Sequence, residues 1–272
     1  MELKATRYDI RGAVAVIFLA RPHRRNAWTG RMHTEYRFLL DKANKDRTVG
    51  AIVVSGEGDS FCVGGDSQAL QGHSARGSYD SGVSGDISVP GYGIDERFDA
   101  TFAYHYGLDK PIIAAINGAA AGVGLALAAF ADVRFSVPMA KLTTAHGKLN
   151  LPAEYGLSWI LPRLVGLGRA NDLLLTSRVF MSEEAEKIGF VNQVFSSKKL
   201  LHETEKYARE LVKHISPDSL RQTRWQIYRD QHDTVARSVE NSEELLESMM
   251  RDEDFREGVR ALVEKRIPRW KE

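Results

Sequence analysis

Cysteine is nearly absent from this sequence of 272 residues, in which Cys62 is the only one. A lone cysteine excludes an intramolecular disulfide framework and fits a reducing compartment. A strong charge of one sign is also missing, because 37 Lys and Arg residues face 36 Asp and Glu residues. Without a positive field to attract phosphates, nucleic acid is not an expected partner. The polar start MELKATRYD lacks the layout of a signal peptide, which predicts a cytoplasmic protein.

An uninterrupted apolar run that could span a membrane is missing as well. The most apolar stretch, residues 111–133, is long enough for a span on length alone. However, Asn117 and three glycines interrupt it, and isoleucines at its start precede alanine-rich residues. We therefore expect a buried strand, a turn and a buried helix here, and no contact with a membrane.

Motifs for bound cofactors and metals are also lacking. A dinucleotide-binding turn that uses Gly122 and Gly124 would need a third glycine where Leu127 stands. No G-x-x-x-x-G-K-[ST] phosphate loop occurs, and the eight histidines form no H-E-x-x-H arrangement. The sequence therefore predicts neither a cofactor nor a metal site.

What the sequence does contain is an alternation of strand and helix patterns. Apolar β-rich runs predict strands at residues 13–19, 51–56, 112–116, 132–136 and 190–195. Helical patterns lie between these runs, one of them at about residues 30–45. This order is typical of an α/β core with parallel strands and helical crossovers.

Beyond about residue 198 the strand patterns stop, and charged amphipathic helical patterns take over. We predict a core of residues 1–197 and a helical C-terminal region of residues 198–272 that packs on the core or on another subunit. Residues 71–100 are rich in glycine and serine and longer than most structureless connections. This stretch is either a plain surface insertion or a lid over a ligand site.

Two glycine-bearing turns follow predicted strands, at residues 60–66 and 117–124. Glycine lets a ligand approach the main chain closely, and a helix that begins in the second turn adds unpaired N–H groups. Such turns stabilise an oxyanion if their amides converge. For either turn alone, glycine that serves only tight packing is the simpler reading.

Six segments, taken in their order along the chain, resemble the enoyl-CoA hydratase/isomerase (crotonase) superfamily. They are RPHRRNAW (21–28), SFCVGGD (60–66), KPIIAAINGAAAGVGLALAAFADVRFS (110–136), GLSWILPRLVG (156–166), EEAEKIGFVNQVF (183–195) and FREGVRALVEKRIP (255–268). The resemblance implies a crotonase-like β/α spiral core with a helical C-terminal trimerisation region, assembled as a homotrimer or a dimer of trimers. It also implies acyl-CoA substrates, with coenzyme A as part of the thioester and no separate cofactor.

The resemblance further implies which residues form the site. The backbone N–H groups of Gly65 and Val123 match the oxyanion hole that polarises the thioester carbonyl. Contacts to coenzyme A are implied for Arg25, Ala27, Cys62, Gly64, Asp66 and Lys265. The position of Lys265 is contributed in many members by a neighbouring subunit.

The side chains near the turns decide which reaction is expected. Hydratases of this family use two glutamates, and the matching positions here hold Ala126 and His146. A third family position holds Glu154, where double-bond and ring-opening isomerases and a dehalogenase carry an acid. The resemblance thus favours Glu154 as a general base that takes a proton from C2 of a 3-enoyl-CoA and returns it at C4. We expect apolar neighbours to raise the pKa of Glu154, among them Leu151, Tyr155 and Trp159.

Several alternatives stay open at this point. His146 is either a second base or a residue that lines the pocket. The rival functions are hydration with a water held by Glu154 and His146, another crotonase reaction such as ring opening or thioester hydrolysis, and non-catalytic binding of acyl-CoA. Of the remaining polar residues, we expect Cys62 to be a small packed side chain and Asp66 and Asp132 to stabilise turns. Ser182 is expected to cap a helix that begins at residue 183.

Overall fold

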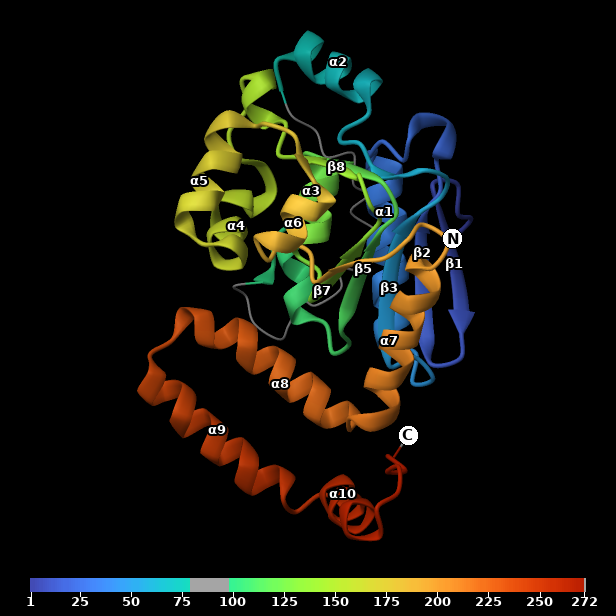
Figure 1. The fold of residues 1–272 in the computed structure, drawn as a ribbon, viewed down its shortest axis with the longest axis vertical. Coiled ribbons are helices and arrows are strands. Elements are labelled where there is room, and N and C mark those ends of the chain that lie inside the picture. The colour runs from blue at the N-terminus through green and yellow to red at the C-terminus, as the bar shows by residue number, and fades with distance from the viewer. Residues whose placement is uncertain (79–97, 272) are drawn as a thin grey trace.

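The larger of two β-sheets forms the centre of the computed structural model, which describes residues 1–78 and 98–271 (Figure 1). Its strands, in spatial order, are β1 (Thr6–Arg11), β2 (Val14–Leu19), β3 (Ala51–Gly56), β5 (Ile112–Ile116), β7 (Val133–Ser136) and β10 (Gln193–Val194). β1 pairs with β2 in antiparallel orientation, and the remaining pairs are parallel. The predicted α/β core with parallel strands is confirmed.

Both faces of this sheet are covered, which explains its continuous apolar strands. Because side chains alternate along a strand, Ile17 and Leu19 of β2 pack into one cluster and Val16 and Phe18 into another. The first cluster includes residues of α1 (Gly30–Lys45), and the second includes residues of α7 (Leu200–His214). Figure 1 shows α7 lying across the sheet.

A second, smaller sheet carries the turns on which the site depends. It consists of β4 (Ser60–Cys62), β6 (Ala119–Ala121), β8 (Lys141–Thr143) and β9 (Phe180–Met181), in that order. β4, β6 and β8 are parallel, so their carboxyl ends lie at one edge of the sheet. Ligands of α/β proteins commonly bind at such an edge.

Further helices surround the two sheets. They are α2 (Ser67–Arg76), α3 (Val123–Ala129), α4 (Leu157–Val165), α5 (Leu167–Thr176), α6 (Ser182–Lys187), α8 (Pro217–Arg229), α9 (Val235–Met249) and α10 (Glu253–Glu264). From Leu200 onward the described chain is helical apart from its connections and its end, as predicted. No helix in the described part of the chain has both the length and the apolar content of a membrane span.

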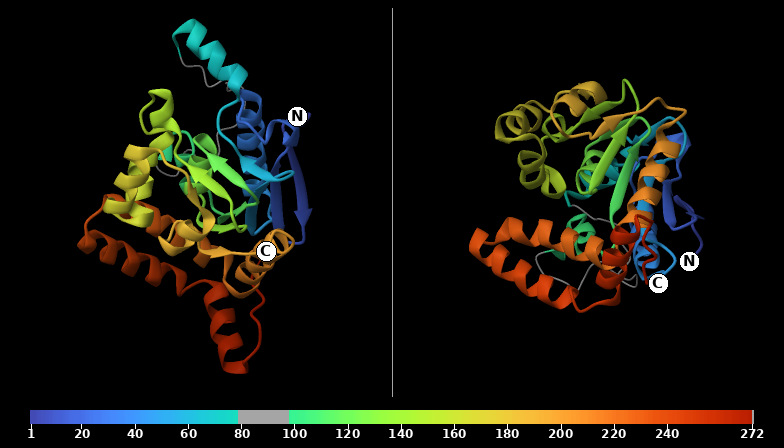
Figure 2. Two further views of the ribbon diagram at one scale, coloured as in Figure 1. Left: turned by 45° about the horizontal axis from the view of Figure 1, so that its top comes forward. Right: turned by 60° about the horizontal axis from the view of Figure 1, so that its bottom comes forward.

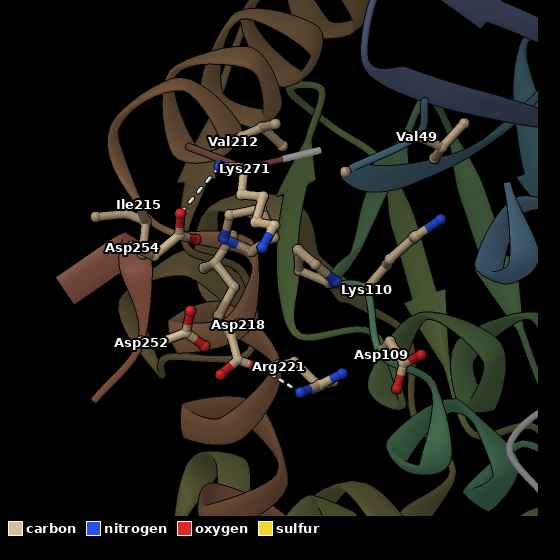
Figure 3. A pocket seen from close by; sticks show the side chains of 14 residues that line it. Val49, Asp109, Lys110, Val212, Ile215, Asp218, Arg221, Asp252, Asp254 and Lys271 are labelled. Atoms are coloured by element: carbon tan, nitrogen blue, oxygen red, sulfur yellow. Dashed lines mark hydrogen bonds and ion pairs between the residues drawn. The ribbon is translucent and has the colours of Figure 1, made fainter. Parts of the chain in front are cut away.

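The C-terminal helices extend from the body at the end opposite α2 (Figures 1 and 2). Asp254 at the start of α10 connects two distant segments, because its carboxylate accepts hydrogen bonds from Ser216 Oγ at 3.1 Å and from the backbone N–H of Lys271 at 2.9 Å. Asp254 and Lys271 border a cavity of about 330 Å³ between the C-terminal helices and the core (Figure 3). Lys110 closes its other side, with Nζ donating to the carbonyl of Ala43 at 2.6 Å. The two hydrogen bonds to Asp254 thus connect the end of the chain to α10, and α10 to the start of α8.

Three expectations from the sequence are wrong in detail. Residues 71–76 belong to α2 rather than to a structureless connection, and the helix ends where Gly77 adopts a φ of 65°. The strand expected at residues 190–195 is reduced to Gln193–Val194. Ser182 does not cap α6, because its hydroxyl accepts a hydrogen bond from Ala140 N at 3.1 Å, outside the helix. Residues 79–97, where a lid was one reading, lie outside the described residues.

Candidate active site

The two predicted glycine turns lie side by side in the structure. β4 leads into Gly64 and β6 into Gly122, and the two strands are neighbours in the smaller sheet. Gly64 has a φ of 107° and Gly122 a φ of 50°, which side chains other than glycine rarely adopt. Each glycine therefore turns the chain sharply just before the residue predicted to donate its N–H, Gly65 or Val123.

Close packing holds the two turns against each other. A Cβ on Gly124 would lie 2.1 Å from the carbonyl oxygen of Cys62, and a Cβ on Gly64 would lie 3.4 Å from that of Ala121. Cys62 itself is fully buried, and burial raises the pKa of its thiol to about 12. The expectation of a small packed side chain at this position is confirmed, since a thiol with this pKa is a poor nucleophile.

The amides of Gly65 and Val123 are unused by the rest of the described chain. On either side of Gly65, the carbonyl of Gly64 accepts from Trp28 N at 2.8 Å and Asp66 N donates to the carbonyl of Trp28 at 2.9 Å. Neither Gly65 N nor Val123 N has an acceptor among the described residues. Val123 is the first residue of α3, where a helix leaves its N–H groups without internal partners. Two free donors thus stand at the ends of neighbouring strands.

Both amides border one cavity of about 820 Å³, and six of the ten predicted site residues line it. They are Gly64, Gly65, Asp66, Val123, His146 and Glu154. His146 follows β8, the third parallel strand of the smaller sheet, and Glu154 follows a few residues later. The fold therefore brings together residues that are up to 90 positions apart in the sequence, Gly64 and Glu154.

Of the two carboxylates that line this cavity among the described residues, Glu154 is better suited than Asp66 to act as a general base. It is half-buried, and burial raises its pKa, although His146 opposes the shift. No hydrogen bond or ion pair from residues 1–78 or 98–271 engages the carboxylate. Leu151 and Tyr155 line the cavity with it, as expected. Trp159 is not part of the cavity wall, and its ring stacks on His232 with the centroids 5.6 Å apart.

The backbone beside the two titratable side chains is in an unfavourable conformation. Ala145, just before His146, has a φ of 60°, and Tyr155, just after Glu154, has a φ of 51°. A left-handed conformation costs a residue with a Cβ about 1–2 kcal/mol. Strain of this kind persists where the surrounding structure enforces it, and it is frequent at active sites. Here it fixes how the His146 and Glu154 segments enter the cavity.

Asp66 has a structural partner on each side. Its carboxylate caps α2 by accepting from Gln68 N at 3.0 Å, and it pairs with Arg21 at 3.0 Å and Arg24 at 3.2 Å. Burial works to raise the pKa of this carboxyl, but the hydrogen bond from Gln68 and those from the two arginines lower it. Asp66 is therefore held ionised at the rim of the cavity, where it stabilises the turn as expected.

Four predicted residues do not line the cavity. Cys62 is buried behind it, and Ala27 is buried with its carbonyl accepting from Arg21 Nη1 at 2.6 Å. Arg25 is exposed, but its carbonyl accepts from Val63 N at 3.3 Å, so its segment runs beside the first turn. Lys265 is exposed at the end of α10, at the opposite end of the molecule from α2 (Figure 1). A single chain does not bring Lys265 to the cavity.

The sequence did not reveal the part of the wall that α2 contributes. Gln68, His73 and Arg76 of this helix line the cavity. The available signals were the capping residue Asp66 and the terminating glycine, Gly77. Within the described residues, no group of three or more His, Cys, Asp or Glu side chains is arranged to hold a metal ion.

The edge of the parallel strands presents two free amides and, in the same cavity, one half-buried carboxylate. Such an arrangement can stabilise an oxyanion next to a proton acceptor. Residues 9–272 match the enoyl-CoA hydratase/isomerase family, and the chain belongs to this family. The resemblance drawn from the sequence is confirmed.

Individual relatives cover nearly the whole chain. The 1,2-epoxyphenylacetyl-CoA isomerase of Escherichia coli K12 is 29% identical over 258 residues, which are 94% of each chain. An enoyl-CoA hydratase of Alternaria alternata is 33% identical over 261 residues, covering 95% of this chain and 83% of the relative. The solved structure of an enoyl-CoA hydratase from Bacillus anthracis superposes with a TM-score of 0.86 at 25% identity, covering 98% of this chain and 99% of that one. The crotonase-like fold is thus confirmed, and relatives named as isomerase and as hydratase both match.

Proposed function

We propose that this enzyme of the enoyl-CoA hydratase/isomerase family shifts a double bond in an enoyl-CoA by proton transfer through a thioester enolate. One observation carries the proposal. Two backbone amides without acceptors in the described chain, Gly65 N and Val123 N, line the same cavity as a half-buried carboxylate, Glu154. Carbonyl polarisation and a single base are sufficient for this reaction.

The order of events follows from these positions. Hydrogen bonds from Gly65 N and Val123 N to the thioester oxygen stabilise the negative charge that develops when C2 loses its proton. Glu154 accepts this proton, and its raised pKa makes it a stronger base than an exposed glutamate. The same carboxyl returns the proton at C4, which leaves the double bond between C2 and C3.

Hydration is the second candidate, because His146 lines the cavity and an imidazole and a carboxylate could hold a water between them. The two hydratase positions argue against it. Ala126 is fully buried in α3 and offers no proton-transfer group, and His146 replaces the second carboxylate. Isomerisation needs neither of the two missing glutamates.

Placement of coenzyme A is the next part of the proposal. The resemblance assigns it to the segment of Arg25 and Ala27, to Cys62, Gly64 and Asp66, and to Lys265. Support comes from the backbone hydrogen bonds that join residues 25–28 to residues 63–66 beside the free amides. Coenzyme A enters as part of the substrate.

Assembly as a homotrimer or a dimer of trimers completes the proposal. The C-terminal helices leave large apolar side chains uncovered in the single chain, among them Val235 at 82%, Leu262 at 78% and Val263 at 75% exposed. Such surfaces are typical of subunit interfaces. A neighbouring subunit is also the proposed source of the Lys265 contact.

The test is a comparison of Glu154→Gln with the unmodified protein on a 3-enoyl-CoA and on crotonyl-CoA. We expect the unmodified protein to isomerise the 3-enoyl-CoA faster than it hydrates crotonyl-CoA, and the variant to lose isomerisation while it still binds acyl-CoA. Undiminished turnover by the variant would refute the role of Glu154. Faster hydration than isomerisation by the unmodified protein would favour the second candidate.

A further inference from the structure

His146 has no task in a proton transfer that Glu154 performs alone. Its side chain is 93% buried at the edge of the cavity, with 7% of its surface exposed. Nδ1 is buried without a hydrogen-bond partner among the described residues. Leaving a buried polar group unpaired is costly, and such groups in folded proteins commonly await a ligand or a bound water.

The main chain around His146 is held firmly, so the ring has a defined position. His146 N donates to the carbonyl of Thr144 at 2.8 Å, and its own carbonyl accepts from Leu151 N at 3.1 Å. The next amide, that of Gly147, donates to Ser177 Oγ at 3.0 Å. The left-handed conformation of Ala145 is enforced within this network. A polar ring fixed in this way is suited to recognition of a ligand group.

The surroundings of the ring indicate which part of the ligand it would meet. Leu149, Leu151 and Tyr155 line the same cavity as His146, and they offer mainly apolar surface to an acyl group. His146 and Glu154 line the same cavity, and His146 acts to lower the pKa of the Glu154 carboxyl. The imidazole is therefore a polar group among largely apolar side chains of the cavity wall. It shares the cavity with the Glu154 carboxylate, which acts on C2 and C4 in the proposed reaction.

We propose that His146 forms a hydrogen bond with an oxygen substituent of the acyl group, so that the substrates are acyl-CoA thioesters that carry a hydroxyl or a carbonyl oxygen beyond the thioester. The inference rests on the proposed function, because it takes the cavity to be the acyl site. A neutral imidazole has one donor and one acceptor nitrogen, and a hydroxyl satisfies either of them, whereas a carbonyl accepts from the donor. A plain hydrocarbon chain leaves the ring unpaired.

The experiment measures dissociation constants by calorimetry with the full chain and ligands that cannot react. The probes are hexanoyl-CoA with its 6-hydroxy and its 4- and 5-oxo derivatives, and phenylacetyl-CoA with its 3- and 4-hydroxy ring derivatives. At least one oxygenated probe should bind about tenfold more tightly than its parent, the effect of one hydrogen bond to a buried group. If no oxygenated probe binds more tightly than its parent, the proposal is wrong.

Variants assign the preference to the ring. His146→Phe should lose it, and His146→Asn, which keeps a polar atom near the position of Nδ1, should retain part of it. Leu175→Ala, at a side chain of α5 that is 83% exposed and outside the cavity, should leave the ratio of the two constants unchanged. A preference that persists in His146→Phe would overturn the proposal.

Failure of this inference differs from failure of the proposed function. The binding preference needs no turnover and should persist in Glu154→Gln. Conversely, His146→Phe could lose turnover equally on plain and oxygenated substrates while the unmodified protein shows no binding preference. This result would assign the ring to acid–base chemistry and refute its role in recognising an oxygen substituent.

Discussion

Replacing Gly124 by alanine tests how the two turns are held together. The added Cβ would lie 2.1 Å from the carbonyl oxygen and 2.8 Å from the Cβ of Cys62. Real Cβ atoms do not approach main chain so closely, so β4 and the start of α3 must separate. Overpacking of this kind costs about 1–3 kcal/mol. Alanine gains at most about 1 kcal/mol over glycine from helix propensity, so destabilisation wins.

The consequence for catalysis is larger than that for stability. Gly124 directly follows Val123, so a shift of about 1 Å in this turn moves one of the two oxyanion donors, and displacements of that size reduce rates about 100-fold. Steady-state kinetics on a 3-enoyl-CoA would report this loss, and thermal denaturation would report a lower Tm for a protein that still folds.

Gly168→Ala provides the matched control, because the same change in α5 places a Cβ with no neighbour within 4 Å. This control should keep its activity and gain stability by up to about 1 kcal/mol. If Gly124→Ala has the kcat/KM and Tm of the unmodified protein, the packed turns do not position the oxyanion hole and the reasoning is wrong.

The remaining predictions concern ionisation and burial. Because the ionised form of Glu154 is the base and burial raises its pKa, kcat/KM should rise with pH through a midpoint above 4.5; a flat profile would exclude this role. The raised pKa also means that the folded state loses stability as the pH rises from the ordinary value of 4.5 to the raised pKa, so Glu154→Gln should increase the Tm at pH 7. Asp132→Ala should lower the free energy of unfolding in urea by about 3–5 kcal/mol, because it leaves the buried guanidinium of Arg224 unpaired; a loss below about 1 kcal/mol would contradict the buried pair, which is 2.9 Å long. Iodoacetamide should fail to modify Cys62 in the native protein at pH 8 and should react once guanidinium unfolds the chain, because burial raises the thiol pKa to about 12; modification of the native protein would show that the site is open.

Strands β2, β3 and β5 of the larger sheet could be predicted because each contains a run of several apolar residues. The strand expected at residues 51–56 coincides with β3, and the helix expected at about residues 30–45 coincides with α1. Their patterns repeat over enough residues to be recognised. In contrast, β4, β6 and β8 have three residues each, too few for a pattern to show. Their pairing depends on the glycines that let the turns approach each other.

Helix α2 was not predicted from the sequence because its residues are mostly small or polar, without an apolar face to the core. None of its side chains is buried. A cap at Asp66 and a left-handed Gly77 define its ends, and these are weak signals in a glycine-rich stretch.

Glycines and acidic residues in the site were recognisable, but what each side chain contacts was not. The hydroxyl of Ser182 was expected to cap a helix. Instead it accepts a hydrogen bond from a distant amide, Ala140 N, and this contact cannot be read from the local sequence. Trp159 was expected beside Glu154 from its closeness in the sequence, but the cavity wall does not include it, and its stacking on His232 could not be read from the sequence. Contacts of this kind depend on tertiary packing.

The account is tested most directly by a structure of the protein with bound hexanoyl-CoA. We predict the thioester oxygen at about 2.7–3.1 Å from both Gly65 N and Val123 N, and a carboxylate oxygen of Glu154 at about 3–3.5 Å from C2 and within similar reach of C4. A thioester oxygen bound away from these two amides, or a Glu154 carboxylate beyond reach of both carbons, would contradict the account.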